Sequence, residues 1–357
     1  MAETGLLFVG TYTHEPSPAR ESSGQGIYTC RLTMASGALE IVGVTSAVNP
    51  SYLALDAAGP FLYAVSEKQD GAVLAYQLDR GSGQLSLLNQ LESQGAFPCY
   101  IALDALHRHA FVSHYGDGSL ALLDLALDGR LGAVKQLHVH HGAGHIPDRQ
   151  ASPHIHSARP DPSNQLVLAA DLGTDELMIY RLDAAEPQLS LLSRTPVEPG
   201  AGPRHLDFNA TGSILYLVQE LNNNVSVFGL TPSTGVLTLR QTISMLPPNF
   251  SGNSLAADLH LHPAGRFLYA SNRGHDSLAI FGVDQQTGRL NLIGHEATRG
   301  ETPRSFAIDP TGRLLVVANQ DSHTLVTFWI DPHTGLLSFT GHTLELPAPA
   351  CLKFWPA

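Results

Sequence analysis

The chain repeats one pattern at intervals of about 50 residues. Each copy is an alternating apolar run, a tight turn and a second apolar run, as in LHLHPAGRFLYASNR and SFAIDPTGRLLVVANQ. Alternation on both sides of a short turn is typical of a β-hairpin. A fixed period of this length indicates a repeat fold in which each unit packs against its neighbours. The turn residues of six copies are Gly59, His107, Asn164, Gly212, Gly265 and Gly312.

A third apolar run follows most hairpins, and a second turn and a short fourth run come after it, as in DSLAIFGVDQQTGRLNLIG. Four strands in about 50 residues are typical of one blade of a β-propeller. The 357 residues therefore predict an all-β, seven-bladed propeller with four-stranded antiparallel blades, as one domain over residues 1–357. The alternative architecture, a pair of β-sandwiches, does not explain the fixed period.

The two ends of the chain complement each other. The first copy, from LLFVGTYT to SGALEIVG, lacks the strand that should precede its first hairpin turn. The C-terminal segment PAPACLKFWPA reads as that missing strand. We expect it to join the first blade, which closes the ring and removes an open sheet edge.

Charge and composition exclude several classes of partner. The net charge is −12 and no run of Lys or Arg occurs, so nucleic acid and anionic membranes are not expected partners. No apolar stretch reaches 18 residues, so no membrane span is expected. Cys30, Cys99 and Cys351 are odd in number and widely spaced, and they form neither a disulfide framework nor a zinc motif. With no signal-peptide pattern, we expect a cytoplasmic protein with free thiols.

The hairpin register predicts which side chains meet in the centre. Residues equally far from a hairpin turn lie together at its open end, and the first strand of each blade lines the central channel. Positions eight before and eight after each turn should therefore form a ring at one mouth of the channel. The positions eight before the turn are Ser51, Cys99, His156, Arg204, Ala257 and Arg304. The positions eight after the turn are Glu67, Tyr115, Leu172, Glu220, Arg273 and Gln320. If the register of the third copy slips by one residue, Asp171 takes the place of Leu172.

The predicted ring is strongly charged. It holds three arginines, two glutamates and one histidine, although the chain has only 20 Lys and Arg in total. Arginine binds carboxylate or phosphate through two parallel hydrogen bonds. Glutamate and histidine beside it can transfer protons. The ring predicts an anion-binding pocket with acid–base groups, and the alternative is a structural belt of ion pairs such as Arg204 with Glu220.

Histidines gather in the segment HVHHGAGHIPDRQASPHIH, residues 138–156. His156 falls in the predicted ring, whereas His154 precedes the strand and lies in the loop. Two histidines two residues apart on a strand share one face, so a metal site is an alternative. No Asp, Glu or Cys set has matching ligand spacing, so we predict no metal and no cofactor. This longest connection between blades is either a flap over the channel or a surface loop.

Several motifs together resemble a known family. The specific ones are RQASPHIHS and ASNRGHDS, supported by FVGTYT, ADLGTDELMIYRLD and GPRHLDFNATGSILYLVQELNNNVSVF. Over nearly its whole length the chain resembles the seven-bladed propeller lactonases, which include bacterial 6-phosphogluconolactonases and fungal carboxy-muconate lactonizing enzymes. The resemblance implies hydrolysis of 6-phosphoglucono-1,5-lactone in the oxidative pentose phosphate pathway. It also implies an active site made of His156, Arg204, Glu220 and Arg273.

Lactone hydrolysis needs a base for water, stabilisation of an oxyanion and an anchor for the substrate anion. Glu220 or His156 is the expected base, and Arg204 and Arg273 are expected to hold the oxyanion or the phosphate. The alternatives are another sugar lactone or muconate-type lactone, lactonization, and a non-enzymatic scaffold that binds protein partners. The sequence leaves the oligomeric state open. The further substrate-binding candidates are Arg304, Glu67, His154, Asp171 and Gln320.

Overall fold

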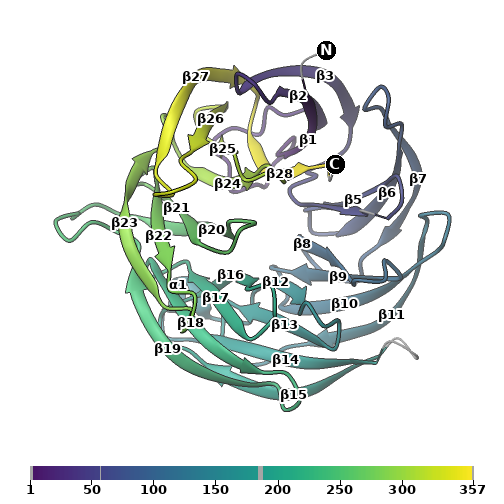
Figure 1. Cartoon of the computed structure of the whole chain (residues 1–357). Coiled ribbons are helices and arrows are strands. Elements are labelled where there is room, and N and C mark those ends of the chain that lie inside the picture. The colour runs from purple at the N-terminus through teal and green to yellow at the C-terminus, as the bar shows by residue number, and fades with distance from the viewer. Residues whose placement is uncertain (1–2, 57, 184–187, 356–357) are drawn as a thin grey trace.

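The computed structural model describes residues 3–56, 58–183 and 188–355. Seven four-stranded antiparallel sheets are arranged in a ring, as Figure 1 shows. The predicted seven-bladed propeller is therefore confirmed. Within residues 3–56, 58–183 and 188–355 there is one helix, α1 (Pro147–Gln150), and no helix long and apolar enough to cross a membrane.

Each blade runs from an inner strand at the channel to an outer strand at the rim. The inner strands are β28 (Pro349–Phe354), β4 (Leu53–Asp56), β8 (Pro98–Leu103), β12 (Ile155–Pro160), β16 (Pro203–Phe208), β20 (Leu255–Leu261) and β24 (Pro303–Ile308). The second strands are β1 (Thr4–Thr11), β5 (Phe61–Ser66), β9 (His109–His114), β13 (Leu166–Asp171), β17 (Ile214–Gln219), β21 (Phe267–Arg273) and β25 (Leu314–Asn319). The third strands are β2 (Gly26–Thr33), β6 (Ala72–Leu78), β10 (Ser119–Leu125), β14 (Glu176–Asp183), β18 (Asn224–Thr231), β22 (Ser277–Val283) and β26 (Thr324–Ile330). The outer strands are β3 (Ala38–Ser46), β7 (Leu85–Glu92), β11 (Leu131–Val139), β15 (Gln188–Pro196), β19 (Val236–Ser244), β23 (Leu290–Ala297) and β27 (Leu337–Glu345).

The C-terminal strand closes the ring as predicted. β28 pairs antiparallel with β1, with Gly10 opposite Cys351 and Phe8 opposite Lys353. The first blade therefore contains the order β28-β1-β2-β3, and both chain ends lie in it (Figure 1). This pairing satisfies the backbone of β1, which would otherwise be an open edge.

Burial explains the sequence pattern of the strands. The second strand of the fifth blade, β17, is buried at every residue, because adjacent blades cover both faces of the sheet. The outer strand β19 is instead mostly exposed, with Leu237 as its one buried residue. Apolar clusters fill the space between blades, as where Leu166, Leu215 and Phe228 pack together. Each such fully buried side chain contributes roughly 1.5–3 kcal/mol of transfer free energy.

A β-bulge lies at the start of the inner strand in six of the seven blades. In the inner strand pair of the fourth blade, Ile155 is opposite Asp171 and Ser157 is opposite Ala170, which leaves His156 without a partner. A bulged residue is unpaired, and the bulge turns its side chain away from the regular alternation. Most bulged residues are the predicted ring residues: Cys99, His156, Arg204, Ala257 and Arg304, with Asp258 beside Ala257 and Ala350 in the closing strand.

Candidate active site

A cavity of about 260 Å³ opens at the bulged end of the inner strands. Its walls come from six blades, from the long loop before β2 and from the histidine-rich loop. The lining residues are Pro16, Ser17, Pro18, Glu67, Phe97, Cys99, Tyr115, Arg149, His156, Glu220, Arg273 and Arg304. Five of the predicted functional residues are therefore brought to one place: His156, Glu220, Arg273, Arg304 and Glu67.

Glu220 is the centre of the charged network. Its carboxylate contacts three arginines: Arg149 Nη2 at 2.5 Å, Arg204 Nε at 2.9 Å and Arg273 Nη2 at 2.9 Å. Burial favours the neutral form of Glu220, but the three positive charges outweigh burial and hold its pKa well below the usual range. Glu220 is therefore an ionised group that is difficult to protonate.

Arg204 lies below the cavity and is almost fully buried, at 1% exposed. Besides Glu220 it donates from Nη1 to the carbonyl oxygen of Ala257. Arg273 donates from Nη2 to the carbonyl oxygen of Ala256 as well as to Glu220. Burial lowers the pKa of Arg273 to about 10, since the pull of Glu220 only partly offsets it. Both arginines remain cationic at neutral pH.

Arg149 reaches the cavity from the histidine-rich loop. It is the third residue of α1, and the next residue, Gln150, is fully buried. Gln150 accepts hydrogen bonds from the backbone N–H groups of residues 145 and 146, and donates to Leu172 O and Asp175 Oδ1. These four bonds fix the loop and so fix the direction of the Arg149 side chain.

His156 is a neutral imidazole at the cavity floor. Burial, and then the positive charge of Arg204, lowers its pKa well below the ordinary value of histidine. Its Nδ1 atom is buried and accepts or donates no hydrogen bond within the described residues. A neutral histidine has one ring nitrogen with a free lone pair, which can accept a proton. His156 therefore has the chemistry of a general base.

Arg304 is 9% exposed, and its guanidinium carbon lies 5.3 Å from the centre of the Tyr12 ring. Tyr12 in turn donates to Glu67 Oε2 at 2.9 Å. Within the part of the chain that the structure describes, no carboxylate lies within 4.0 Å of Arg304 and no hydrogen-bond acceptor meets its guanidinium. It is a buried cation that faces the cavity without a partner.

The other predicted residues lie outside the cavity wall. His154 is on its far side, where its ring stacks on Tyr115 with ring centres 4.5 Å apart and its Nδ1 lies 2.6 Å from Tyr115 O. Asp171 is fully buried and accepts the backbone N–H of His154. Gln320 donates to Pro18 O at 3.3 Å, which ties the loop before β2 to the seventh blade.

The histidine-rich loop has a structural explanation. His140 uses both ring nitrogens within the protein, at 2.8 Å from Asp171 Oδ2 and 2.8 Å from Tyr180 Oη. No group of three or more His, Cys, Asp or Glu side chains placed to hold a metal occurs among residues 3–56, 58–183 and 188–355.

Several cavity residues do not follow from the hairpin register. Arg149 belongs to the loop that crosses from β11 to β12, and residues 16–18 belong to the long loop between β1 and β2, so neither has a position in an inner hairpin. Tyr115 falls in the predicted ring, but the sequence gives it no role. The sequence signal for Arg149 is the RQ pair of the RQASPHIHS motif.

Comparison with known proteins identifies the family. Residues 6–354 match the family described as Lactonase, 7-bladed beta-propeller. The chain belongs to this family. It is 35% identical over 350 residues to a 6-phosphogluconolactonase of Bacillus subtilis (strain 168), covering 97% of each chain. It is 34% identical over 312 residues to a 6-phosphogluconolactonase of Formosa agariphila, covering 85% of this chain and 86% of that protein.

A solved structure agrees with the family. The periplasmic gluconolactonase PpgL of Pseudomonas aeruginosa is 35% identical to the chain and superimposes with a TM-score of 0.92 over 99% of both chains. The seven-bladed lactonase fold is thus shared over the whole length, including the two ends that close the ring.

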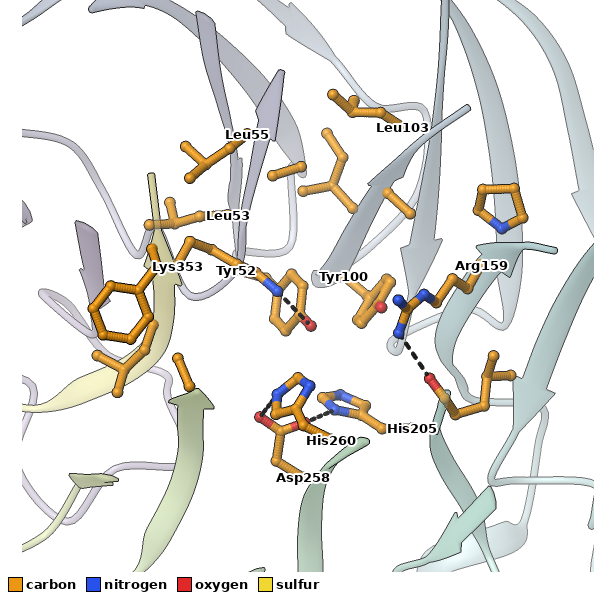
Figure 2. A pocket seen from close by; sticks show the side chains of 18 of the residues that line it. Tyr52, Leu53, Leu55, Tyr100, Leu103, Arg159, His205, Asp258, His260 and Lys353 are labelled. Carbon is orange, nitrogen blue, oxygen red and sulfur yellow. Dashed lines mark hydrogen bonds and ion pairs between the residues drawn. The ribbon is translucent and has the colours of Figure 1, made fainter. Parts of the chain in front are cut away.

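The opposite mouth of the propeller channel is a wider hollow of about 540 Å³ (Figure 2). Tyr52 and Tyr100 stack there with ring centres 4.2 Å apart, and Lys353 and Arg159 approach this pair from opposite sides in Figure 2. Between the two hollows lies a separate void of about 10 Å³, lined by His156, His205 and Arg304 among others, with room for about one water molecule. His156 also lines the cavity beside Glu220 and does not line the wider hollow.

Proposed function

We propose that this member of the lactonase family hydrolyses 6-phospho-D-glucono-1,5-lactone to 6-phosphogluconate, a step of the oxidative pentose phosphate pathway. Two relatives at about 35% identity carry the name 6-phosphogluconolactonase, and the match to one of them covers 97% of each chain. The cavity chemistry supports the same substrate independently, through the charge of its walls and the position of Arg304.

The cavity has an excess of positive charge. Four arginines, Arg149, Arg204, Arg273 and Arg304, surround two glutamates, Glu67 and Glu220, which leaves two positive charges without an anion. A phosphate monoester carries about −1.5 to −2 at pH 7. A phosphorylated lactone therefore balances the charge of the cavity, whereas a neutral sugar lactone does not.

Arg304 is the observation that carries the proposal. A buried charge without a partner is costly, so an unpaired arginine in a cavity is a reason to expect an anionic ligand there. The planar guanidinium suits the oxygens of a phosphate group. We assign Arg304 to the phosphate of the substrate. The guanidinium of Arg304 lies over the ring of Tyr12.

The remaining groups suit the reaction at the lactone carbonyl. His156 takes a proton from a water molecule as that water attacks C1, and the carbonyl electrons move to the oxygen. Arg273 and Arg149 stabilise the resulting oxyanion. The bond between C1 and the ring oxygen then breaks, and the imidazolium of His156 returns its proton to the leaving oxygen, which gives the hydroxy acid.

Glu220 has a different role in this scheme. Nδ1 of His156 has no hydrogen-bond partner within the described residues, whereas both carboxylate oxygens of Glu220 are already engaged by three arginines. Glu220 instead orders Arg149, Arg204 and Arg273 around the reacting carbonyl. Of the two candidate bases from the sequence, the geometry supports His156.

A second candidate function is hydrolysis of an unphosphorylated gluconolactone. The similarity to the Pseudomonas aeruginosa gluconolactonase favours it. In the first function Arg304 binds the phosphate group of the substrate, and in the second the substrate has no phosphate. Only the first function therefore predicts competitive inhibition by inorganic phosphate.

The test is turnover of 6-phosphogluconolactone, generated in situ, beside glucono-1,5-lactone, with spontaneous hydrolysis subtracted. We expect a strong preference for the phosphorylated lactone and competitive inhibition by inorganic phosphate. Equal turnover of both lactones without inhibition by phosphate would support the second function. Turnover of neither by well-folded protein would overturn both.

A further inference from the structure

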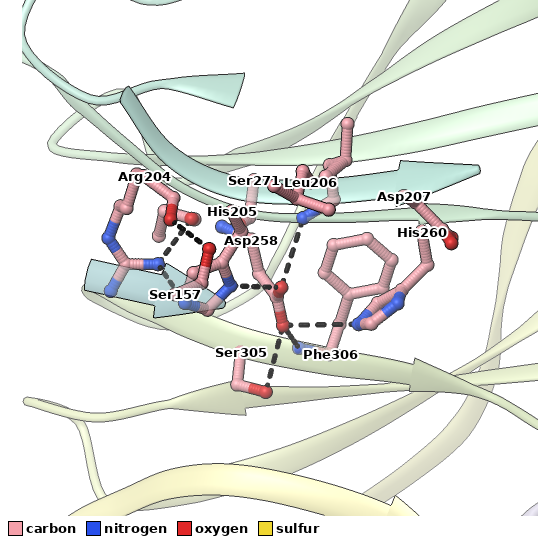
Figure 3. A network of polar contacts seen from close by, with 12 residues as sticks. Ser157, Arg204, His205, Leu206, Asp207, Asp258, His260, Ser271, Ser305 and Phe306 are labelled. Atoms are coloured by element: carbon pink, nitrogen blue, oxygen red, sulfur yellow. Dashed lines mark hydrogen bonds and ion pairs between the residues drawn. The ribbon is translucent and has the colours of Figure 1, made fainter. Parts of the chain in front are cut away.

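A line of polar contacts continues from Arg204 into the centre of the propeller (Figure 3). Arg204 Nη1 lies 3.4 Å from His205 Nε2, and His205 Nδ1 lies 2.8 Å from Asp258 Oδ1. The three side chains are 1%, 5% and 2% exposed, so no bulk water intervenes. His205 and Asp258 do not line the 260 Å³ cavity, although the ring centre of His205 lies 5.2 Å from that of His156.

The bulges of two blades create this line. Arg204 is the unpaired residue between Pro203 and His205, so that Arg204 and His205 both reach the channel although they are neighbours on a strand. Asp258 lies in the bulge of β20, on the next blade. The contact between His205 and Asp258 therefore joins two neighbouring blades.

Asp258 is held firmly in place. Its Oδ1 also accepts the backbone N–H of Leu259 at 3.0 Å, and its Oδ2 accepts from Ser305 Oγ at 3.1 Å and lies 3.2 Å from His260 Nε2. Burial disfavours its charge, but His260 and the other donors outweigh burial and hold its pKa well below the usual range. Asp258 is therefore an ionised group with only acceptor atoms.

These contacts decide the tautomer of His205. Since an ionised Asp258 can only accept, the hydrogen lies on His205 Nδ1. Burial, and then the charge of Arg204, lowers the pKa of His205 to about 3, so the ring is neutral. Its Nε2 atom then has a free lone pair, and that lone pair faces an N–H of Arg204.

We propose that His205 and Asp258 are positioning residues for Arg204. Asp258 fixes His205 in the Nδ1–H tautomer, and Nε2 of His205 then accepts from Arg204 and holds its guanidinium against Glu220. With the other tautomer, an N–H would point at the N–H of Arg204 and turn the guanidinium away. This inference rests on the proposed function only for its kinetic consequence, because the tautomer can be observed without substrate.

The direct experiment is nuclear magnetic resonance of the full chain labelled with ¹⁵N in histidine, with the His205 signal assigned by its absence in His205→Asn. We expect a neutral Nδ1–H ring that does not titrate between about pH 5 and 9, because its pKa is about 3. An Nε2–H tautomer, or titration in that range, would overturn the proposal. Either result is independent of whether the chain hydrolyses a lactone.

The kinetic experiment uses two substitutions that each keep one contact. An Asn amide reaches about as far as Nδ1, so His205→Asn can still donate to Asp258 but no longer accepts from Arg204. A Gln amide reaches about as far as Nε2, so His205→Gln keeps the acceptor for Arg204. We expect His205→Asn to lower kcat by about 10- to 10²-fold, because a displaced Arg204 would shift Glu220 and the two arginines that Glu220 holds at the reacting carbonyl, and a small misplacement there has an effect of this size. His205→Gln should recover part of this loss.

A double-mutant cycle separates positioning from general damage. In an Arg204→Lys background, His205→Asn should change kcat by less than about twofold, because the group that it positions is already gone. The matched control is His109→Asn. His109 is another buried histidine, at the start of β9, and its Nδ1 lies 3.7 Å from Asp104 Oδ2. It should lower the melting temperature and leave kcat unchanged. Independent, additive losses of kcat for His205→Asn and Arg204→Lys would contradict the proposal.

Discussion

The guanidinium carbon of Arg304 lies 5.3 Å from the centre of the Tyr12 ring, and both side chains are buried. Tyr12 belongs to the segment after β1, and Arg304 is the bulged residue of β24. Burial opposes the charge of Arg304, but Tyr12 and then Glu67 outweigh it and raise its pKa. The cavity thus keeps a cation that the aromatic ring supports and that no carboxylate neutralises within the described residues.

Replacement of Arg304 by Met should discriminate between the two lactones. A hydrogen bond to a charged group is worth about 1.5–3 kcal/mol, so kcat/KM for 6-phosphogluconolactone should fall by about 10- to 10²-fold. The value for glucono-1,5-lactone should stay near that of the wild type. Arg181→Met is the control, because it removes a half-buried positive charge that does not line the cavity and whose Nη2 donates to Ser233 O. An equal loss for both substrates would refute the assignment of Arg304 to phosphate.

Glu220→Gln should destabilise the protein in a pH-dependent way. The change leaves three arginines without their carboxylate, and breaking a buried ion pair costs about 3–5 kcal/mol at pH 7. The pKa of Glu220 is lower in the folded than in the unfolded chain, where it is about 4.3. Its stabilising effect is therefore complete above about pH 5 and is lost as the pH falls further.

Urea unfolding of wild type and Glu220→Gln from pH 7 to pH 3 measures this dependence. The difference in free energy of unfolding should be constant down to about pH 5 and shrink below it. A difference that grows toward acid pH would show that Glu220 is protonated in the folded state.

His156→Ala should affect the chemical step. Loss of a general base typically lowers the rate by about 10²- to 10⁴-fold, and KM should change little because Arg304 still holds the substrate. Because the pKa of His156 is depressed, wild-type kcat/KM should stay flat from pH 8 to below the ordinary histidine pKa of about 6.5 and fall only in more acidic solution. His154→Ala is the comparison, since that ring lies behind Tyr115, and we expect a small effect. Unchanged kcat in His156→Ala would exclude it as the base.

Arg149 and Gln150 should give the same kinetic defect with different stabilities. Arg149→Ala removes a side chain that is 33% exposed, so we expect lower kcat/KM at nearly unchanged melting temperature. Gln150→Leu removes four hydrogen bonds and leaves buried groups such as Asp175 with fewer partners, so we expect the kinetic loss together with a lower melting temperature. Full activity in Gln150→Leu would show that the loop holds Arg149 without this anchor.

The sequence by itself determined the fold and the ring of candidate residues. Both follow from local rules: four strands recur in each period, and a hairpin brings together residues such as Arg204 and Glu220 that are 16 positions apart. Because each hairpin has the same register, one rule located His156, Arg204 and Arg304 in three different blades. The closing strand could be predicted because one blade lacked a strand.

The tertiary structure decided what each candidate touches. Arg149 and Glu220 are 71 positions apart and meet only because a loop fixed by Gln150 crosses between blades. Register placed Asp171 near the ring, but its carboxylate is already engaged by His140 and does not reach the cavity. The strand pattern gives the period, whereas contacts between blades and the bulges that redirect side chains depend on the closed ring. For this reason the three arginines around Glu220, the unpaired Arg304 and the tautomer of His205 could be read only from the folded chain.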